Sequence, residues 1–220
     1  MLPPNGLTRC LTTNGLLSEN QRSLGRKPSY VRLRRSTISQ QIIIDKGLSM
    51  ALHGKFVIND AYYSPLSFPG IGTFLAFSGN GAYRNRGACG MIPKEGPVPA
   101  GKYWIVDRPQ GGLKSQLNTV GRDIYNHFAN GATFKHSEWF ALWRDDWGID
   151  DYTWIESVQR GNFRLHPGVL SEGCITLPHD SDFAMLRNAL LRSQKIDVPC
   201  MRKLQAYGTI EVISYGKTCP

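Results

Sequence analysis

A histidine and a cysteine lie close together in residues 163–177, a segment with several chemically active side chains. His166 ends an alternating, strand-like stretch, and Cys174 follows eight positions later, just beyond a tight turn. A thiol with an ordinary pKa of about 8.5 is a weak nucleophile at neutral pH, but a nearby imidazole can accept its proton. The pattern therefore predicts nucleophilic catalysis, with Cys174 as the attacking group and His166 as its base.

Two further residues of the turn, Ser171 and Gly173, are candidates for the catalytic site. Gly173 permits a sharp bend that would aim the N–H groups of Gly173 and Cys174 at a developing oxyanion. Ser171 is placed to hydrogen-bond within the turn or to the substrate. The group that orients His166 stays open, because a backbone carbonyl and a side chain elsewhere are both compatible with the sequence.

The other cysteines have no comparable partner pattern and are expected to be structural: Cys10, Cys89, Cys200 and Cys219. Cys200 and Cys219 would pair if the C-terminal segment folds back in an oxidising compartment, which is one of several open connectivities. A zinc site from His166, Cys174, His179 and Cys200 has a spacing unlike the usual ligand patterns, so we expect no metal.

Length and composition favour a single catalytic domain. The 220 residues are 41% hydrophobic, enough for one full core, and the 23 glycines and 13 prolines favour many short elements joined by turns. The net charge of +9 is concentrated in residues 1–49, whose net charge is +6, and the rest of the chain has no nucleic-acid-binding motif. We therefore expect no nucleic-acid partner, although a mild positive field would suit an anionic polymer such as peptidoglycan.

Residues 1–49 are predicted to be a disordered leader, and the catalytic domain is placed at 50–216. The only apolar cluster of the leader, residues 42–44, is far shorter than the ~7–15 apolar residues of a secretory signal or the ~20 of a membrane span. We expect neither feature. Two alternatives remain for the leader: a segment resembling an organelle transit peptide, or an over-extended translation whose true start is Met50.

The elements that must position the catalytic pair are mostly short strands. Alternating or apolar runs predict strands at residues 55–59, 73–78, 101–107, 139–143, 161–166 and 208–214. Apolar residues three and four apart predict two main helices, one over 113–128 and one after Pro178, capped by Asp180 or Ser181. The second would bury Phe183, Leu186, Leu190 and Leu191. The fold class is therefore α+β and β-rich, with a twisted antiparallel sheet or sandwich and the catalytic turn at one end of the sheet.

Several ordered motifs resemble the L,D-transpeptidases of the YkuD type, and more closely the L,D-transpeptidase-like effectors delivered by type VI secretion. The resemblance covers roughly residues 50–215 and includes the Ser171-x-Gly173-Cys174-Ile175 core with His166 upstream. The other similar segments are residues 77–81, 96–105, 139–142, 149–151 and 160–167. The spacing of eight positions from His166 to Cys174 is shorter than in the broader transpeptidase group, and the effector branch also has a short spacing.

The resemblance implies that Cys174 attacks the carbonyl between the L centre of meso-diaminopimelate and the terminal D-Ala of a tetrapeptide stem. Water would then complete an L,D-carboxypeptidase cycle, or the amine of another D-amino acid would complete an exchange. It implies no cofactor. It also implies synthesis in the bacterial cytoplasm without a signal peptide, delivery to the periplasm of target cells, and a secretion-machine carrier and an immunity protein as partners.

Three residues are candidates for substrate binding. Thr176 stands where many transpeptidases carry a substrate-binding arginine, and Arg164 on the neighbouring strand is the candidate for supplying the positive charge. Tyr83 is either part of a substrate groove or an ordinary loop aromatic. Two rival functions remain: an inactive cell-wall-binding module, and a thiol peptidase or amidase that cleaves another bond.

Overall fold

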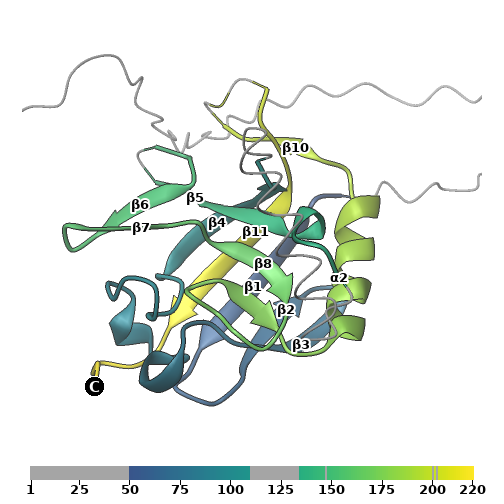
Figure 1. Cartoon of the computed structure of the whole chain (residues 1–220). Helices are drawn as coiled ribbons and strands as arrows, with labels where there is room; N and C mark the ends of the chain where they lie inside the picture. Colours follow the sequence, from purple (N-terminus) through teal and green to yellow (C-terminus); the bar gives the residue numbers. More distant parts are fainter. Residues whose placement is uncertain (1–49, 110–133, 147, 200, 202) are drawn as a thin grey trace, which may run out of the picture. The chain divides into compact units, whose positions relative to one another are not determined.

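The computed structural model describes residues 50–109, 134–146, 148–199, 201 and 203–220. All of these residues lie in one compact unit, Ser49–Pro220. A large β-sheet with one helix beside it forms this unit (Figure 1). Among the described residues, no helix is long and apolar enough to span a membrane.

The described elements are mostly strands of three to seven residues, as the many turns of the sequence predict. In chain order they are β1 (Leu52–Ile58), β2 (Ser64–Phe68), β3 (Gly72–Ala76), η1 (Gly81–Tyr83), η2 (Gly87–Cys89), β4 (Gly101–Asp107), η3 (His136–Glu138), β5 (Phe140–Arg144), β6 (Tyr152–Ile155), β7 (Val158–Gly161), β8 (Arg164–Pro167), β9 (Ile175–Leu177), α2 (Asp180–Arg192), β10 (Ile196–Asp197) and β11 (Gln205–Ser214), where η denotes a short 3-10 helix.

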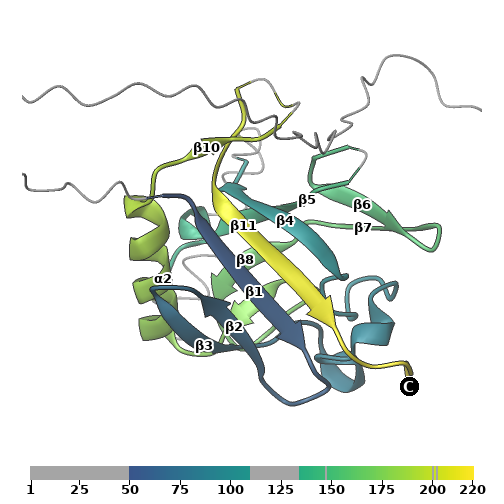
Figure 2. The same cartoon turned by 180° about the vertical axis from the view of Figure 1, so that it is seen from behind.

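The main sheet has the strand order β3-β2-β1-β11-β4-β5-β8-β9, with β10 paired to β11, and it is nearly closed (Figures 1 and 2). Phe77, directly after β3, forms a bridge to Thr176 of β9: each N–H donates to the other's carbonyl, at 2.9 and 2.8 Å. The two ends of the strand order therefore meet beside the segment that carries Cys174. Strands β6 and β7 form a separate two-stranded sheet.

The expectation of an antiparallel sheet is wrong for two strand pairs. β1 pairs with β11 in parallel, and so does β8 with β9. Short parallel neighbours are hard to foresee because parallel strands usually need a long crossover connection, whereas only residues 168–174 join β8 to β9. The resulting fold is a β-rich α+β domain with a mixed sheet.

Helix α2 covers the core behind the predicted catalytic strands. Phe183, Leu186 and Leu190 are fully buried, as their spacing predicts, and they belong to the same cluster as Leu165 and Ile175 of β8 and β9. Burying each such side chain contributes roughly 1.5–3 kcal/mol. The helix therefore fixes the two strands from their core-facing side.

Two details of the predicted second helix differ from the structure. Leu191 is 44% exposed, and the N-cap is His179 rather than Asp180 or Ser181. Asp180 instead lies in the first turn, where a carboxylate interacts favourably with the helix dipole. The other expected helix, over residues 113–128, lies outside the described residues, so α2 is the only α-helix in the described part of the chain.

A disulfide joins Cys89 of η2 to Cys219 near the C-terminus, with a Cα–Cα distance of 5.1 Å. The considered pairing of Cys219 with Cys200 is therefore wrong. The reason lies in the packing of η2 against the end of β11: a Cβ atom added to Gly87 would lie 1.7 Å from the Ser214 hydroxyl. This contact brings Cys89 beside the segment that follows β11.

Candidate active site

The register of β8 against β9 explains the spacing of the predicted catalytic pair. Leu165 is paired with Ile175, and His166 with Thr176. Side chains alternate along extended chain, and Leu165 and Ile175 point into the core. His166 and Thr176 therefore point to the other side, and Cys174, two positions before Thr176, falls on that side as well.

His166 is held in one orientation by three neighbours. Its ring is 6% exposed and stacks on Trp139, with ring centroids 4.2 Å apart and an interplanar angle of 19°. Nδ1 lies 2.8 Å from the Pro167 carbonyl oxygen, and Nε2 lies 3.2 Å from the Thr176 hydroxyl. The sequence left open which group orients this histidine, and the orienting group proves to be a backbone carbonyl.

These partners determine which nitrogen of His166 can act as a base. A carbonyl oxygen only accepts hydrogen bonds, so Nδ1 carries a hydrogen and donates a hydrogen bond to the Pro167 carbonyl. Burial lowers the pKa of His166 to about 4, reinforced by the positive charges of Arg108 and Arg164 and opposed in part by the hydrogen bond to Pro167. The imidazole is therefore neutral at pH 7, with the lone pair of Nε2 available to accept a proton.

The neutral, buried state of His166 predicts a pH-dependent stability. An unfolded histidine has a pKa of about 6.5, so the unfolded state binds the proton first as the pH falls. The contribution of His166 to the free energy of unfolding is complete above about pH 6.5 and is lost between 6.5 and 4, by roughly 3 kcal/mol for the full shift. Urea unfolding of wild type and His166→Gln at pH 7.5, 5.5 and 4.5 measures this loss. Parallel pH dependences in the two proteins would contradict the prediction.

Ser171 and Gly173 shape the turn before Cys174. The Ser171 hydroxyl donates to the Cys174 carbonyl at 2.8 Å and accepts from the N–H of Gly79 at 3.2 Å. Among the described residues, Ser171 therefore both bonds within the turn and joins the turn to Gly79. Gly173 has a φ of +99°, and a Cβ atom there would lie 2.7 Å from the guanidinium of Arg160. Glycine is required at this position for both reasons.

The backbone N–H groups of Gly173 and Cys174 lie on adjacent residues of the turn before β9. In the described part of the chain, neither group donates a hydrogen bond. Two adjacent donors on a turn held by Ser171 match the arrangement that stabilises an oxyanion. The role of these two N–H groups in binding an oxyanion stays a prediction.

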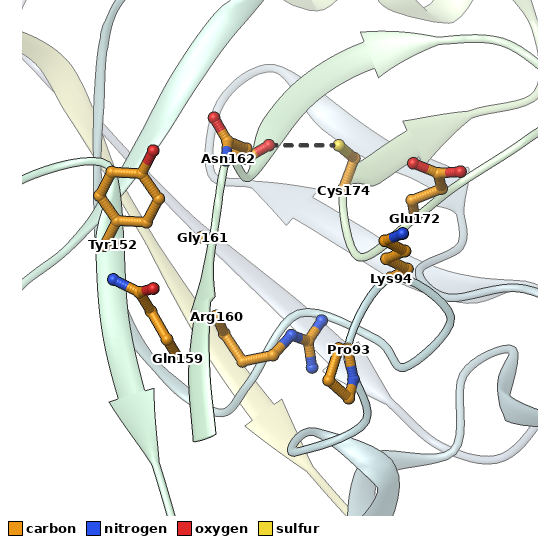
Figure 3. Close-up of a pocket in the computed structure, with 9 residues that line it drawn as sticks. All are labelled: Pro93, Lys94, Tyr152, Gln159, Arg160, Gly161, Asn162, Glu172 and Cys174. Carbon is orange, nitrogen blue, oxygen red and sulfur yellow. Dashed lines mark hydrogen bonds between the residues drawn. The ribbon is translucent and has the colours of Figure 1, made fainter. Parts of the chain in front are cut away.

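The Cys174 thiol lies 3.9 Å from the Asn162 carbonyl, to which it is oriented (Figure 3). Burial raises the pKa of the Cys174 thiol to about 11, and the backbone N–H and the charge of Arg164 oppose this only in part. No hydrogen bond between described residues joins the thiol to His166, whose Nε2 faces Thr176 instead. Hydrogen bonds between catalytic groups are often long in a free enzyme and tighten when substrate binds.

A cavity of about 300 Å³ opens beside Cys174 (Figure 3). Its lining is largely polar and comes from three segments: the turn around Lys94, the β6–β7 hairpin and the turn before the thiol. The lining residues are Pro93, Lys94, Tyr152, Gln159, Arg160, Gly161, Asn162, Glu172 and Cys174. The volume is at the lower end of the range typical of ligand sites.

Buried Arg160 connects the walls of this cavity. Its guanidinium donates to the carbonyls of Gly90, Gly96 and Pro97, the last two at 3.0 and 3.3 Å. These three bonds attach the end of the hairpin to the segment that carries Lys94. Buried carbonyl groups need such partners, so Arg160 acts as a structural brace.

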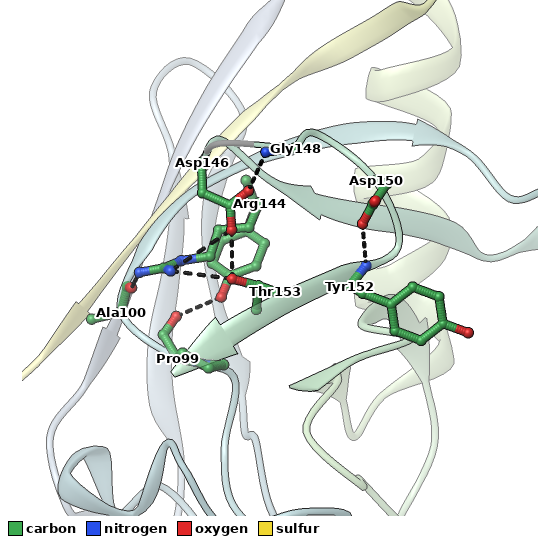
Figure 4. A network of polar contacts seen from close by, with 9 residues as sticks. Pro99, Ala100, Arg144, Asp146, Gly148, Asp150, Tyr152 and Thr153 are labelled. Carbon is green, nitrogen blue, oxygen red and sulfur yellow. Dashed lines mark hydrogen bonds and ion pairs between the residues drawn. The ribbon is translucent and has the colours of Figure 1, made fainter. Parts of the chain in front are cut away.

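A second network fixes the hairpin to the main sheet (Figure 4). Thr153 of β6 donates to the Asp146 carboxylate at 2.5 Å and lies 3.3 Å from the guanidinium of Arg144. Arg144 also donates to the carbonyl of Ala100 at 2.8 Å. Since Tyr152 and Gln159 line the cavity, this network holds one of its walls in place.

The three predicted substrate-binding residues have other positions or partners in the structure. Arg164 forms a bidentate ion pair with Asp151, at 2.5 and 2.6 Å, so its charge is already matched. Thr176 is fully buried and bonded to His166. Tyr83 belongs to η1 and does not line the cavity beside Cys174.

Most residues that line this cavity are not predicted from the sequence, namely Lys94, Tyr152, Gln159, Asn162 and Glu172. Only Glu172 carried a local signal, because it lies within the turn two positions before Cys174. Within the described residues, no group of three or more His, Cys, Asp or Glu side chains is arranged to hold a metal ion.

Comparison with known proteins gives one match. The family model described as the Tlde1 domain matches residues 72–201, which include the turn before Cys174, strands β8 and β9, and the cavity lining. Neither the curated proteins nor the solved structures give a significant match to the chain.

Proposed function

Because this chain belongs to the Tlde1 domain family of L,D-transpeptidase-like type VI secretion effectors, we propose that it removes or exchanges the terminal D-Ala of peptidoglycan tetrapeptide stems, with Cys174 as nucleophile and His166 as base. The register of β8 against β9 is the observation that carries this proposal. It supports the placement of the thiol and the neutral imidazole on the same side of the two strands, with the thiol beside a polar cavity.

The first half of the reaction transfers the stem to the enzyme. Cys174 attacks the carbonyl of the third stem residue while Nε2 of His166 takes the thiol proton. The oxyanion is stabilised by the N–H groups of Gly173 and Cys174. When the oxyanion collapses, the peptide C–N bond breaks, the imidazolium returns the proton to the leaving amine, and D-Ala departs from a thioester.

The second half regenerates the thiol. A water molecule attacks the thioester and leaves a tripeptide stem, or the amine of another D-amino acid attacks and restores a tetrapeptide with a new last residue. In both cases Nε2 of His166 removes the proton from the attacking group and returns it to sulfur. Either outcome removes donor stems that a cell wall needs for cross-linking.

The disulfide supports a site of action outside the cytoplasm. The bond between Cys89 and Cys219 needs an oxidising compartment to form and persist, as the bacterial periplasm provides. We therefore place the activity in the periplasm of a target cell, reached by type VI delivery, with a carrier in the secretion machine and an immunity protein in the producing cell as the implied partners.

The test is turnover of purified muropeptides by the full-length oxidised protein, followed by mass spectrometry. Tetrapeptide stems should lose one alanine, and with excess D-methionine they should gain a D-methionine at the same position. Tripeptide stems, which lack the leaving group, are the matched control and should stay unchanged. Cleavage elsewhere in the stem would support a thiol peptidase or amidase instead, and binding without turnover would support an inactive wall-binding module.

A further inference from the structure

Two opposite charges in the cavity beside Cys174 have no side-chain partner in the part of the chain that the structure describes. Lys94 and Glu172 both line it, and both side chains are exposed (Figure 3). Within the described residues, neither makes a hydrogen bond or an ion pair through its side chain. They differ in this from Arg160 and Arg164, whose guanidinium groups are occupied by carbonyl groups and by Asp151.

The backbone that carries each of these two charged side chains has a defined conformation. Lys94 has a φ of +63°, a conformation that is uncommon for residues other than glycine, and its turn is closed by bonds from Glu95 N–H to Pro93 and from Gly96 N–H to Ile92, at 2.7 and 3.1 Å. Arg160 binds the same segment at the Gly96 carbonyl. Left-handed backbone at such a residue is common at ligand sites.

The backbone of Glu172 is held by its two neighbours in the turn. It lies between Ser171, which makes two hydrogen bonds, and Gly173, which packs against Arg160. The cavity therefore has one positive and one negative side chain next to the thiol, each attached to backbone of defined conformation. A ligand that carries both an ammonium and a carboxylate would match both groups, whereas a ligand with one charge would leave the other unmatched.

We propose that Lys94 and Glu172 determine stem specificity by binding the zwitterionic end of the diaminopimelate side chain. Lys94 binds the carboxylate of that end, and Glu172 binds its ammonium group. This inference rests on the proposed function. The side chain branches from the residue whose carbonyl Cys174 attacks, and three methylene groups separate its zwitterionic carbon from that branch point. A cavity of about 300 Å³ that opens at the thiol suits a side chain of this size.

Glu172 also connects recognition with the reactivity of the thiol. Burial is the main reason for the raised pKa of Cys174, and the carboxylate of Glu172 raises it further. An ammonium group bound to Glu172 offsets that negative charge and makes removal of the thiol proton easier. Occupation of the cavity by the correct side chain therefore assists the attack.

The experiment compares four full-length proteins, wild type, Lys94→Met, Glu172→Gln and the double variant, on three synthetic tetrapeptide stems. The stems carry meso-diaminopimelate, the same residue with its side-chain carboxylate amidated, or L-lysine, which has the ammonium group alone. Lys94→Met should raise KM about tenfold for the diaminopimelate stem and leave KM for the other two unchanged, because only the first has the carboxylate. Glu172→Gln should raise KM for all three stems.

Controls with the same change of net charge are Lys217→Met near the C-terminus and Glu156→Gln in the β6–β7 turn, both exposed and outside the cavity. Neither should alter the preference among stems. An equal effect of Lys94→Met on all three stems, or no effect on any, overturns the inference.

Equilibrium binding of the three stems to Cys174→Ala separates this inference from the proposed function. Charge-dependent selectivity in Kd without turnover by wild type would overturn the proposed function alone. Turnover without that selectivity in KM or Kd would overturn the roles of Lys94 and Glu172 alone.

Discussion

Replacing Cys174 by alanine is expected to lower the release of terminal D-Ala by about 10³-fold or more, because no group remains that can form the thioester. No other thiol can take its place within the described residues, where Cys89 and Cys219 form a disulfide and Cys174 is the one free cysteine. Initial rates on diaminopimelate tetrapeptides, measured by mass spectrometry of the released products, test this expectation.

The matched control is Cys174→Ser, which keeps the size of the side chain and the turn but replaces the thiol by a much less acidic hydroxyl. We expect this variant to be strongly impaired as well, with a thermal unfolding midpoint close to that of wild type. Retention of more than a tenth of the wild-type rate by Cys174→Ala would remove this residue from the mechanism.

Replacing His166 by glutamine is expected to lower kcat/KM by about 10²–10⁴-fold, because an amide cannot accept the thiol proton. The pH profile gives a sharper test of the role. With the pKa of the free imidazole at about 4 and that of the thiol at about 11, wild-type kcat/KM should be flat across neutral pH. It should fall only as the pH drops through the imidazole pKa, where His166 gains a proton and can no longer act as a base.

The acid limb should be absent in His166→Gln. His53→Gln is the matched control, since His53 lies on β1, is bonded to Thr209 and takes no part in the site. It should keep both the rate and the acid limb of wild type. An acid limb that persists unchanged in His166→Gln would assign the titration, and with it the base, to another group.

The site residues fall into two groups: those whose roles follow from the local sequence, and those whose roles depend on distant parts of the chain. Cys174, Gly173 and Ser171 belong to one short turn, and their roles in shaping it follow from residue type: the positive φ of Gly173 and the hydroxyl bonds of Ser171 are properties that a local pattern can predict. Arg164 illustrates the opposite case. Its residue type suggested an anion site, but its charge is matched by Asp151, thirteen positions earlier in the chain.

The amino-acid sequence alone determined the alternation that places Leu165 and Ile175 in the core, the helix that buries Phe183, and the turn that carries Cys174. All of these depend on neighbours within a few residues. Tertiary structure alone decided the parallel pairing of β8 with β9, the bond between Cys89 and Cys219, and the meeting of Lys94 with Glu172 in one cavity.

The physical reason is that strand direction and register depend on backbone hydrogen bonds between segments far apart in the chain, and every backbone has the same donors and acceptors. Residue types along a strand therefore indicate which side is buried, but not which strand lies beside it. For Cys174 and His166 this pairing is decisive, because the register of β8 against β9 places the two side chains on the same side of the strands although they are eight positions apart.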